Sequence, residues 1–265
     1  MLAWHQAVVA TDRRRRLQPA LAAFVAVVLA GCAAVPERQP LVLGGVPADQ
    51  ADALVRRWEE EWRRFPGLRA AVDLTIVRRG RAQRSAGALL LSPTRLRFEA
   101  ITPLGLPAVI VVAGPERLLA YSPAERRAWT ARPTPEAMGR WLGVPVEPET
   151  LIRLLAGYVP PPPDGVAVRV AQERGPHLVF ERGALRERVW VTAEGQPARL
   201  QLENGQRLTA TFERAIGGPV QALALEVPRQ SLEVHLRYIS GEYVAPPPEG
   251  FEIVLPAGVT IEQLD

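Results

Sequence analysis

Alternation of apolar and polar residues over most of the chain is the feature that most constrains its fold. A period of two residues is that of a β-strand with one buried face, whereas a helix repeats every 3.6 residues or so. The pattern predicts strands within residues 72–77, 86–91, 95–100, 108–113, 117–121 and 126–130, and within residues 166–170, 200–202, 208–212, 223–225 and 232–238. We therefore expect roughly ten or eleven strands joined mainly by short turns.

The turns between these runs predict antiparallel hairpins. Gly80 lies within a turn at residues 78–81, and Asn204-Gly205 is a strong two-residue hairpin signal between two alternating runs. Such a meander has one apolar face. That face has to be covered by curling of the sheet, by a helix or by an apolar ligand.

Two regions have helical spacing instead. Residues 49–65 have Asp49 or Asp52 as a candidate N-cap and Pro66 and Gly67 as a stop, and their apolar positions three and four apart are Leu54, Val55, Trp58, Trp62 and Phe65. Farther along, Thr134 followed by Pro135 predicts a helix start, and residues 147–156 predict another helix that ends at Gly157. The chain is therefore expected to have an α+β fold, with helices inserted between two groups of strands.

The amino end has the order of charges typical of an export signal. Four arginines at residues 13–16 precede the uncharged stretch 17–30. This stretch has 14 residues, whereas a membrane-spanning helix needs about 20. Residues 1–31 are therefore expected to be a cleaved signal peptide rather than a permanent span.

Leu29-Ala30-Gly31-Cys32 resembles the lipobox of bacterial lipoproteins. The resemblance implies that the Cys32 thiol takes a diacylglycerol, that cleavage follows on its amino side, and that the new amino group is acylated. The alternative is a buried structural cysteine after an ordinary signal. Cys32 is the only cysteine, so no intramolecular disulfide forms. Ala33 stands where retention in the inner membrane is associated with Asp, so the resemblance points to the periplasmic face of the outer membrane.

The mature chain divides into a tether and a domain. Residues 32–48 are rich in proline and glycine, and we expect a lipidated tether that reaches on the order of 50 Å when extended. Residues 49–265 are the expected domain. From Cys32 onward the chain has 28 basic and 27 acidic residues, a formal charge of +1, so no basic surface favours nucleic acid as a partner.

Neither a catalytic site nor a cofactor or metal site is expected. The mature chain has two histidines, His177 and His235, far apart in the sequence, and alternation points His235 outward. The sequence has no Gly-x-Ser-x-Gly elbow and no glycine-rich phosphate loop after a strand. Residues 59–61, all glutamate, are expected on the solvated face of the first helix.

Several short motifs, taken in order, resemble the LolB family of outer-membrane lipoprotein receptors. They are the helix with Trp58 and Trp62, residues 102–105 (TPLG), 142–145 (LGVP) and 151–157 (LIRLLAG). The C-terminal residues 251–261 are more similar to soluble carriers of the LolA type and to another lipoprotein branch of the superfamily. Leu154 departs from the pattern, because the family often has Trp there.

The resemblance implies a curved, incompletely closed antiparallel β half-barrel with helices covering its concave apolar face. In this family the cavity between them holds the acyl chains of a lipoprotein, which the receptor inserts in the outer membrane. The implied partners are an acylated lipoprotein cargo and a periplasmic LolA-like carrier, and we expect a monomer. The candidate cavity-lining residues are Leu74, Ile76, Leu96, Phe98, Val109, Val111, Met138, Trp141 and Leu142.

Leu104, between Pro103 and Gly105, is similar to the exposed apolar residue that the family's receptors use for membrane insertion of cargo. The alternative is a tight turn with Leu104 tucked back into the core. A second functional interpretation also stays open, in which a structural or regulatory outer-membrane lipoprotein uses the same scaffold to bind a protein. A cavity filled by Phe98, Met138 and Trp141 would favour that interpretation.

We predict that Cys32→Ala abolishes incorporation of labelled fatty acid and releases the protein from membranes, because the thiol is the expected acylation site. The measurement is metabolic labelling followed by membrane fractionation. Labelling that persists in the variant would contradict the assignment.

Overall fold

The computed structural model describes residues 47–162, 166, 168–172, 175–214 and 219–264. The expected signal peptide, the lipidation site Cys32 and the tether up to residue 46 lie outside the described residues, and Ala48 already begins a short 3-10 helix. No helix in the described part of the chain is long and apolar enough to span a membrane.

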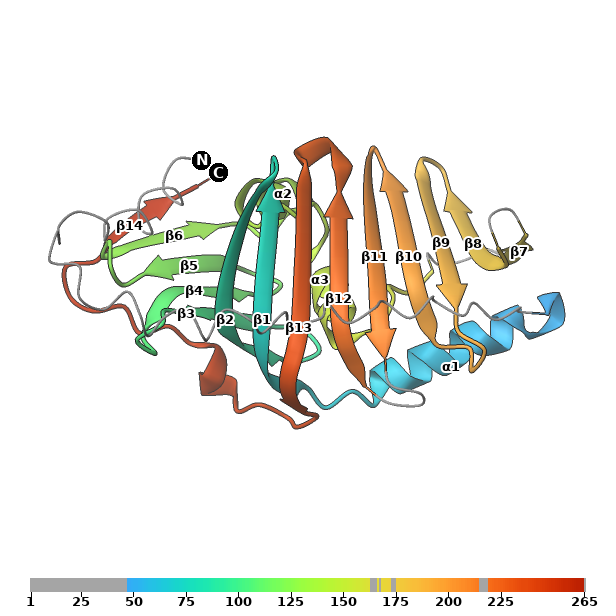
Figure 1. The fold of residues 1–265 in the computed structure, drawn as a ribbon, viewed down its shortest axis with the longest axis horizontal. Helices are drawn as coiled ribbons and strands as arrows, with labels where there is room; N and C mark the ends of the chain where they lie inside the picture. Colours follow the sequence, from blue (N-terminus) through green and yellow to red (C-terminus); the bar gives the residue numbers. More distant parts are fainter. Residues whose placement is uncertain (1–46, 163–165, 167, 173–174, 215–218, 265) are drawn as a thin grey trace, which may run out of the picture. The chain divides into compact units, whose positions relative to one another are not determined.

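Fourteen strands form one sheet (Figure 1). In the first half they are β1 (Leu68–Arg78), β2 (Arg81–Leu91), β3 (Leu96–Ile101), β4 (Pro107–Ala113), β5 (Leu118–Ser122) and β6 (Arg127–Ala131). In the second half they are β7 (Arg169–Ala171), β8 (His177–Arg182), β9 (Leu185–Val191), β10 (Pro197–Asn204), β11 (Gln206–Arg214), β12 (Val220–Val227), β13 (Leu232–Glu242) and β14 (Thr260–Gln263). The expected antiparallel sheet is therefore present in outline.

The spatial order of the strands shows how the two halves join. It runs β14-β6-β5-β4-β3-β2-β1-β13-β12-β11-β10-β9-β8-β7, so β1 and β13 are neighbours although one begins the sheet and the other comes late in the chain. Every pairing is antiparallel except that of β14 with β6. β14 and β7 are the two edges, so the sheet is not closed.

The expected strand count was too low. Three strands were missed, namely β8, β9 and β14. β8 starts with four consecutive buried residues, and a run buried on both faces shows no alternation. β14 is a short edge strand in a parallel pair, with mostly exposed side chains and no period-two pattern.

The hairpin turns form where the glycines predict them. Arg79 and Gly80 connect β1 to β2 with φ values of 51° and 75°, the left-handed backbone that a two-residue hairpin turn requires. Gly205, with φ of 66°, connects β10 to β11 after Asn204. Both turns form at the predicted places, but Asn204 pairs with Gln206, so the second turn is not the expected two-residue Asn-Gly type.

The helices agree with the sequence except at the first cap. The 3-10 helix η2 (Ala48–Gln50) precedes α1 (Ala51–Arg63), whose N-cap is Gln50 without a side-chain bond, so the expected aspartate cap is wrong. α2 (Pro135–Trp141) begins as predicted, because the Thr134 hydroxyl accepts a hydrogen bond from the Ala137 amide. α3 (Pro148–Ala156) ends at Gly157, whose φ is 86°.

Register divides the sheet into two faces. We call the face that carries Leu74, Leu236 and Leu223, which pair across β1, β13 and β12, the inner face. α2 and α3 lie behind the sheet in Figure 1, and α3 meets the inner face where the Tyr238 hydroxyl donates to the Leu155 carbonyl. That helices cover the whole apolar face stays a prediction.

The C-terminal segment crosses the opposite, outer face. It follows β13 through the 3-10 helix η4 (Pro248–Phe251) to β14, and its Ile253, Leu255 and Val259 pack on a cluster formed by Ile110, Leu119, Tyr121 and Ala128. Arg97 donates to the carbonyls of Gly250, at 3.2 Å, and Glu252, at 2.7 Å. Arg97 lies on the outer face, as alternation predicts, but it is half-buried under this segment rather than wet.

Candidate functional site

The strand residues among the cavity candidates lie together on the inner face. Phe98 pairs with Val111 and with Leu89, and Leu89 pairs with Ala70 of β1, the strand that also carries Leu74. Because cross-strand partners point to the same side of a sheet, the register brings six candidates onto one surface. They are Leu74, Ile76, Leu96, Phe98, Val109 and Val111.

These residues differ in how well they are covered. Leu96 and Val111 are buried, whereas Leu74, Ile76, Phe98 and Val109 are half-buried. Val234 of β13, which pairs with Ile76, is half-buried as well. We call these five half-buried side chains the apolar row: Leu74, Ile76, Phe98, Val109 and Val234.

The helical candidates are less uniform. Met138 of α2 is fully buried, and Leu142 just after α2 is half-buried. The side chain of Trp141 lies outside the described part of the structure. A β-carbon on Gly143 would come within 2.5 Å of a Leu232 methyl group. The residues that follow α2 therefore lie against the first residue of β13.

Glycine gives Phe98 its position. A β-carbon added at Gly87 would lie 2.6 Å from the Phe98 ring and 2.9 Å from the Glu99 carbonyl oxygen. The ring therefore lies across the inner face over the bare backbone of β2. It takes space that a larger residue at position 87 would fill.

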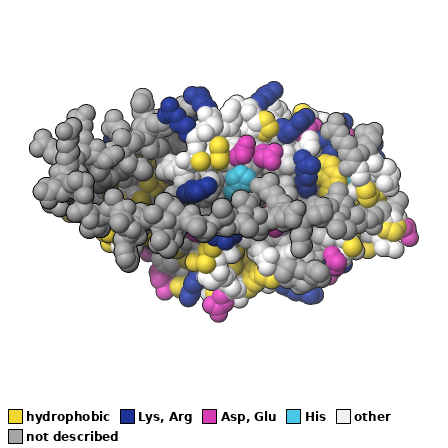
Figure 2. All heavy atoms as spheres, viewed as in Figure 1, with side chains coloured by type: hydrophobic (Ala, Val, Ile, Leu, Met, Phe, Trp, Pro, Cys, Tyr) yellow, Lys and Arg dark blue, Asp and Glu magenta, His cyan; other side chains and the backbone are white. Residues whose placement is uncertain are grey.

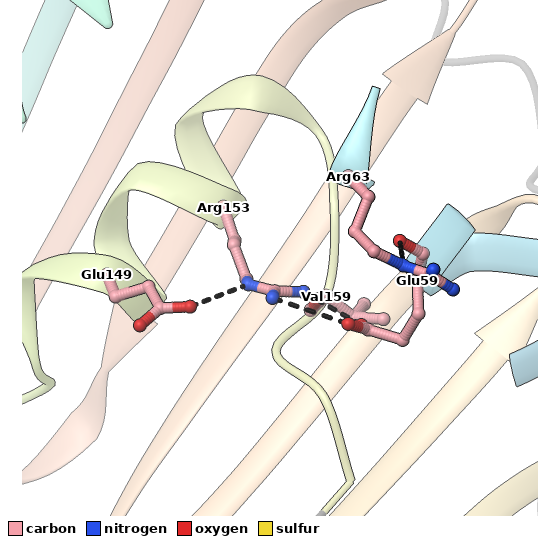
Figure 3. A network of polar contacts seen from close by, with 5 residues as sticks. All are labelled: Glu59, Arg63, Glu149, Arg153 and Val159. Atoms are coloured by element: carbon pink, nitrogen blue, oxygen red, sulfur yellow. Dashed lines mark hydrogen bonds and ion pairs between the residues drawn. The ribbon is translucent and has the colours of Figure 1, made fainter. Parts of the chain in front are cut away.

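A polar network joins α1 to α3 (Figure 3). Arg153 of α3 donates to Glu59 of α1 at 2.8 Å, to Glu149 at 3.3 Å and to the Val159 carbonyl at 3.4 Å. Its guanidinium carbon lies 4.6 Å from the centre of the Trp62 ring, a cation–π contact. Only 5% of the Arg153 side chain is exposed, so these partners replace most of its water.

Glu59 therefore corrects an expectation. Residues 59–61 were expected to lie together on the solvated face of α1, but Glu59 is the ion-pair partner of a buried arginine. A run of three identical charges has no periodicity from which to predict that one member turns inward. The partner, Arg153, lies 94 residues away in the sequence.

Glu187 is the buried polar group on the inner face. It lies on β9, pairs with Leu202 of β10 and Phe180 of β8, and is 2% exposed. Its Oε1 atom has no hydrogen-bond partner. Burial raises the pKa of this carboxyl to about 8, and the nearby positive charge of Arg153 only partly offsets that effect. The neutral acid is therefore the dominant form at pH 7.

Other contacts fix the helices to the sheet. The Trp58 indole donates to the Gly195 carbonyl in the β9–β10 turn at 2.9 Å, and Arg57 donates to the same carbonyl at 2.8 Å. Arg214 of β11 donates to the Gly157 carbonyl at the end of α3. α1 is thus held at the β9–β10 turn and α3 at β11 and β13.

The loop between β3 and β4 carries an exposed apolar tip. Leu104 is 85% exposed and Leu106 is 63% exposed, with Pro103 and Gly105 also exposed. The loop is a closed turn, since the Thr102 amide donates to the Leu106 carbonyl at 2.8 Å and the Gly105 amide donates to the Thr102 carbonyl at 2.9 Å. Leu104 is not tucked back into the core.

The two histidines lie on different strands and in different surroundings. His177 is buried, with its Nδ1 atom 2.8 Å from the Gly175 carbonyl and its ring stacked on Trp190. His235 is half-buried on the outer face, 3.5 Å from Glu233. No group of three or more potential ligands able to hold a metal ion occurs among the described residues. Figure 2 shows basic and acidic side chains interspersed on the face in view.

Comparison with known proteins shows the fold. No family model and no curated sequence matches the chain. A DUF1329 family protein from Desulfovibrio piger superposes with a TM-score of 0.53 at 12% identity, covering 78% of this chain and 97% of that one. A LolA superfamily protein from Nitrosomonas europaea gives 0.52 at 12% identity, covering 78% and 99%. A domain named for outer-membrane lipoprotein sorting, from Vibrio parahaemolyticus, gives 0.51 at 10% identity, covering 77% and 97%.

We predict that Glu187 makes the protein less stable as pH rises between about 4.5 and 8. The unfolded chain loses this proton near 4.5 while the folded chain keeps it up to about 8, so the free energy of unfolding falls by at most about 1.4 kcal/mol per pH unit. Glu187→Gln should remove that slope, measured by urea unfolding at pH 5 and pH 8. Glu226→Gln, at an exposed residue of β12, is the control. If the free energy of unfolding of Glu187→Gln differs from that of the wild type by the same amount at pH 5 and at pH 8, the prediction is contradicted.

Proposed function

We propose that this chain is an outer-membrane lipoprotein that binds the acyl chains of other lipoproteins on the inner face of its sheet and helps to insert them in the outer membrane. The observation that carries the proposal is the apolar row, whose five aliphatic or aromatic side chains are left half-buried on the inner face beside the buried Leu96, Val111 and Leu236. The fold shared with a LolA superfamily protein and with a domain named for lipoprotein sorting supports it.

The energetics of acyl chains suit such a surface. Each methylene removed from water is worth about 0.8 kcal/mol, so a chain of roughly sixteen carbons gains on the order of 12 kcal/mol from shelter. The half-buried members of the apolar row would lose their remaining water to the same ligand. Transfer between two such hosts needs no nucleotide, because the difference between their affinities sets its direction.

The delivery step is assigned to the β3–β4 loop. Leu104 extends from a turn that is closed by its own hydrogen bonds, so its side chain can enter lipid without unfolding the loop. One leucine contributes only about 1.5 to 3 kcal/mol on insertion. That is too little to anchor the protein but enough to favour release of cargo toward the bilayer. The proposed anchor is the lipid on Cys32, and the proposed source of cargo is a LolA-like periplasmic carrier.

The other candidate is a scaffold that binds a protein through the same face. Met138 is fully buried, as that interpretation expects, but Phe98 is not. A bound protein would have to cover the apolar row with side chains of its own. Binding of a simple acylated probe therefore separates the two candidates.

We predict that Ile76→Glu weakens binding of a fluorescent acylated peptide by roughly tenfold or more, because a carboxylate in the apolar row opposes burial of the acyl chain. Ala82→Glu is the matched control, since Ala82 is exposed one strand away and pairs with the outer-facing Val77. The measurement is a fluorescence titration, with urea unfolding to verify that both variants fold. An equal loss of affinity in both variants, or no binding of the acylated peptide by the wild type, would favour the protein-binding scaffold.

We predict that Leu104→Glu leaves folding and acylated-peptide binding nearly unchanged while it slows delivery of bound cargo to liposomes. The reason is position, because Leu104 is exposed at a loop tip away from the packed core. Delivery is measured as transfer of a labelled lipopeptide from the protein to vesicles. A variant that folds, binds and delivers at the wild-type rate would exclude the insertion role.

A further inference from the structure

Three exposed aliphatic side chains lie on two segments that reach the same end of the sheet. Leu104 and Leu106 belong to the β3–β4 loop, and Val254, in the C-terminal segment, is 88% exposed. Val254 is flanked by Ile253 and Leu255, both of which pack on the outer-face cluster. Alternation in an extended segment therefore turns Val254 away from the protein.

The topology brings both segments to that end. β3 to β6 pair antiparallel in order, so the β3–β4 loop and the β5–β6 turn lie at the same end of the four strands. β14 runs parallel to β6, which brings residues 257–259 to that end too. Arg126 of the β5–β6 turn confirms the placement, since it donates to the Ala257 carbonyl at 2.8 Å. Figure 1 shows the C-terminal segment reaching β14 there.

The two segments have the chemistry of a surface that enters lipid. Residues 101–114 and 253–261 carry no charged side chain. Their turns satisfy several backbone groups internally, through the Thr102–Leu106 bonds and through the Val259 amide, which donates to the Pro256 carbonyl. Backbone groups that are paired before contact do not lose water bonds on entering an apolar phase. The nearby cation Arg126 suits the phosphate level of a bilayer.

We propose that the β3–β4 loop and residues 253–258 form a single membrane-contact surface, with Leu104, Leu106 and Val254 as its three apolar tips and a phospholipid bilayer as its partner. This inference rests on the proposed function and deepens it, because delivery would then use two segments rather than one loop. The expected tether before residue 47 reaches on the order of 50 Å, so an anchored chain stays within range of a bilayer. Three apolar tips on segments that carry no charged side chain of their own suit lipid better than they suit the polar rim of a protein interface.

The test places an environment-sensitive fluorophore on a new cysteine in the mature, full-length lipoprotein reconstituted with phospholipid vesicles. Val254→Cys and Leu104→Cys are the test sites, and Ala82→Cys, exposed beside the β1–β2 turn, is the control. The chain has one native cysteine, Cys32. Its acylation blocks the thiol, so the wild type should not label. A wild type that labels would count against the proposed anchor without affecting the contact surface.

We expect blue-shifted emission at positions 254 and 104, quenched by brominated lipid, and aqueous emission at position 82. In the unlabelled protein, Val254→Asp should slow delivery to vesicles by roughly tenfold while acylated-peptide binding is unchanged. An aqueous signal at 254 with a lipid signal at 104 would overturn the composite surface and leave the proposed function intact. Cross-linking of 254 between two copies, in place of lipid quenching, would overturn it in favour of a protein interface.

Discussion

The pairing of β1 with β13 is the contact on which the rest of the architecture depends. β1 to β6 and β7 to β13 could each form from hairpins between neighbours, but neither half alone would make the continuous inner face. Leu74 opposite Leu236 and Ile76 opposite Val234 are the pairs that make it continuous. These partners lie far apart in the sequence, so the pairing carries most of the loop-closure cost of the fold. The apolar row extends across this junction because residues from both halves contribute to it.

The fold combines an apolar surface on the inner face with a polar network between its helices. The apolar row is lined by side chains that gain from burial and make no directional contacts. Arg153, by contrast, donates to Glu59, Glu149 and the Val159 carbonyl, and these directional bonds join α1 to α3. A buried ion pair adds little net stability, but breaking it is costly, so it selects one arrangement of α1 against α3. The result is a fixed polar contact between the helices and an apolar part of the inner face, where the proposed ligand would bind.

Sequence predicted the parts of this structure that depend on local signals. Thr134, Gly157, Arg79-Gly80 and Asn204-Gly205 each act through bonds or backbone angles within a few residues, and each lies where expected. Alternation also put Phe98 and Arg97 on opposite faces. Alternation could not predict that the outer face of β3 is covered. The covering segment, whose carbonyls at residues 250 and 252 accept hydrogen bonds from Arg97, lies more than 150 residues away in the sequence. Glu59, Arg153 and Glu187 were missed for the same reason, since their partners are set by tertiary contacts that leave no periodic trace.

The parallel strand β14 has a consequence for the order in which the molecule is completed. A chain synthesised from its amino end presents β6 long before residues 260–263 are made and can pair with it. Until then the backbone N–H and C=O groups on the edge of β6 that later faces β14 have no strand partner. Such an edge is a template for pairing with other chains. Arg127 and Trp129 of β6 each bond the carboxylate of Glu262, so the final strand is drawn onto that edge by side chains as well as by backbone. Loss of the last few residues in a truncated product would therefore leave the edge of β6 open and promote association between newly made chains.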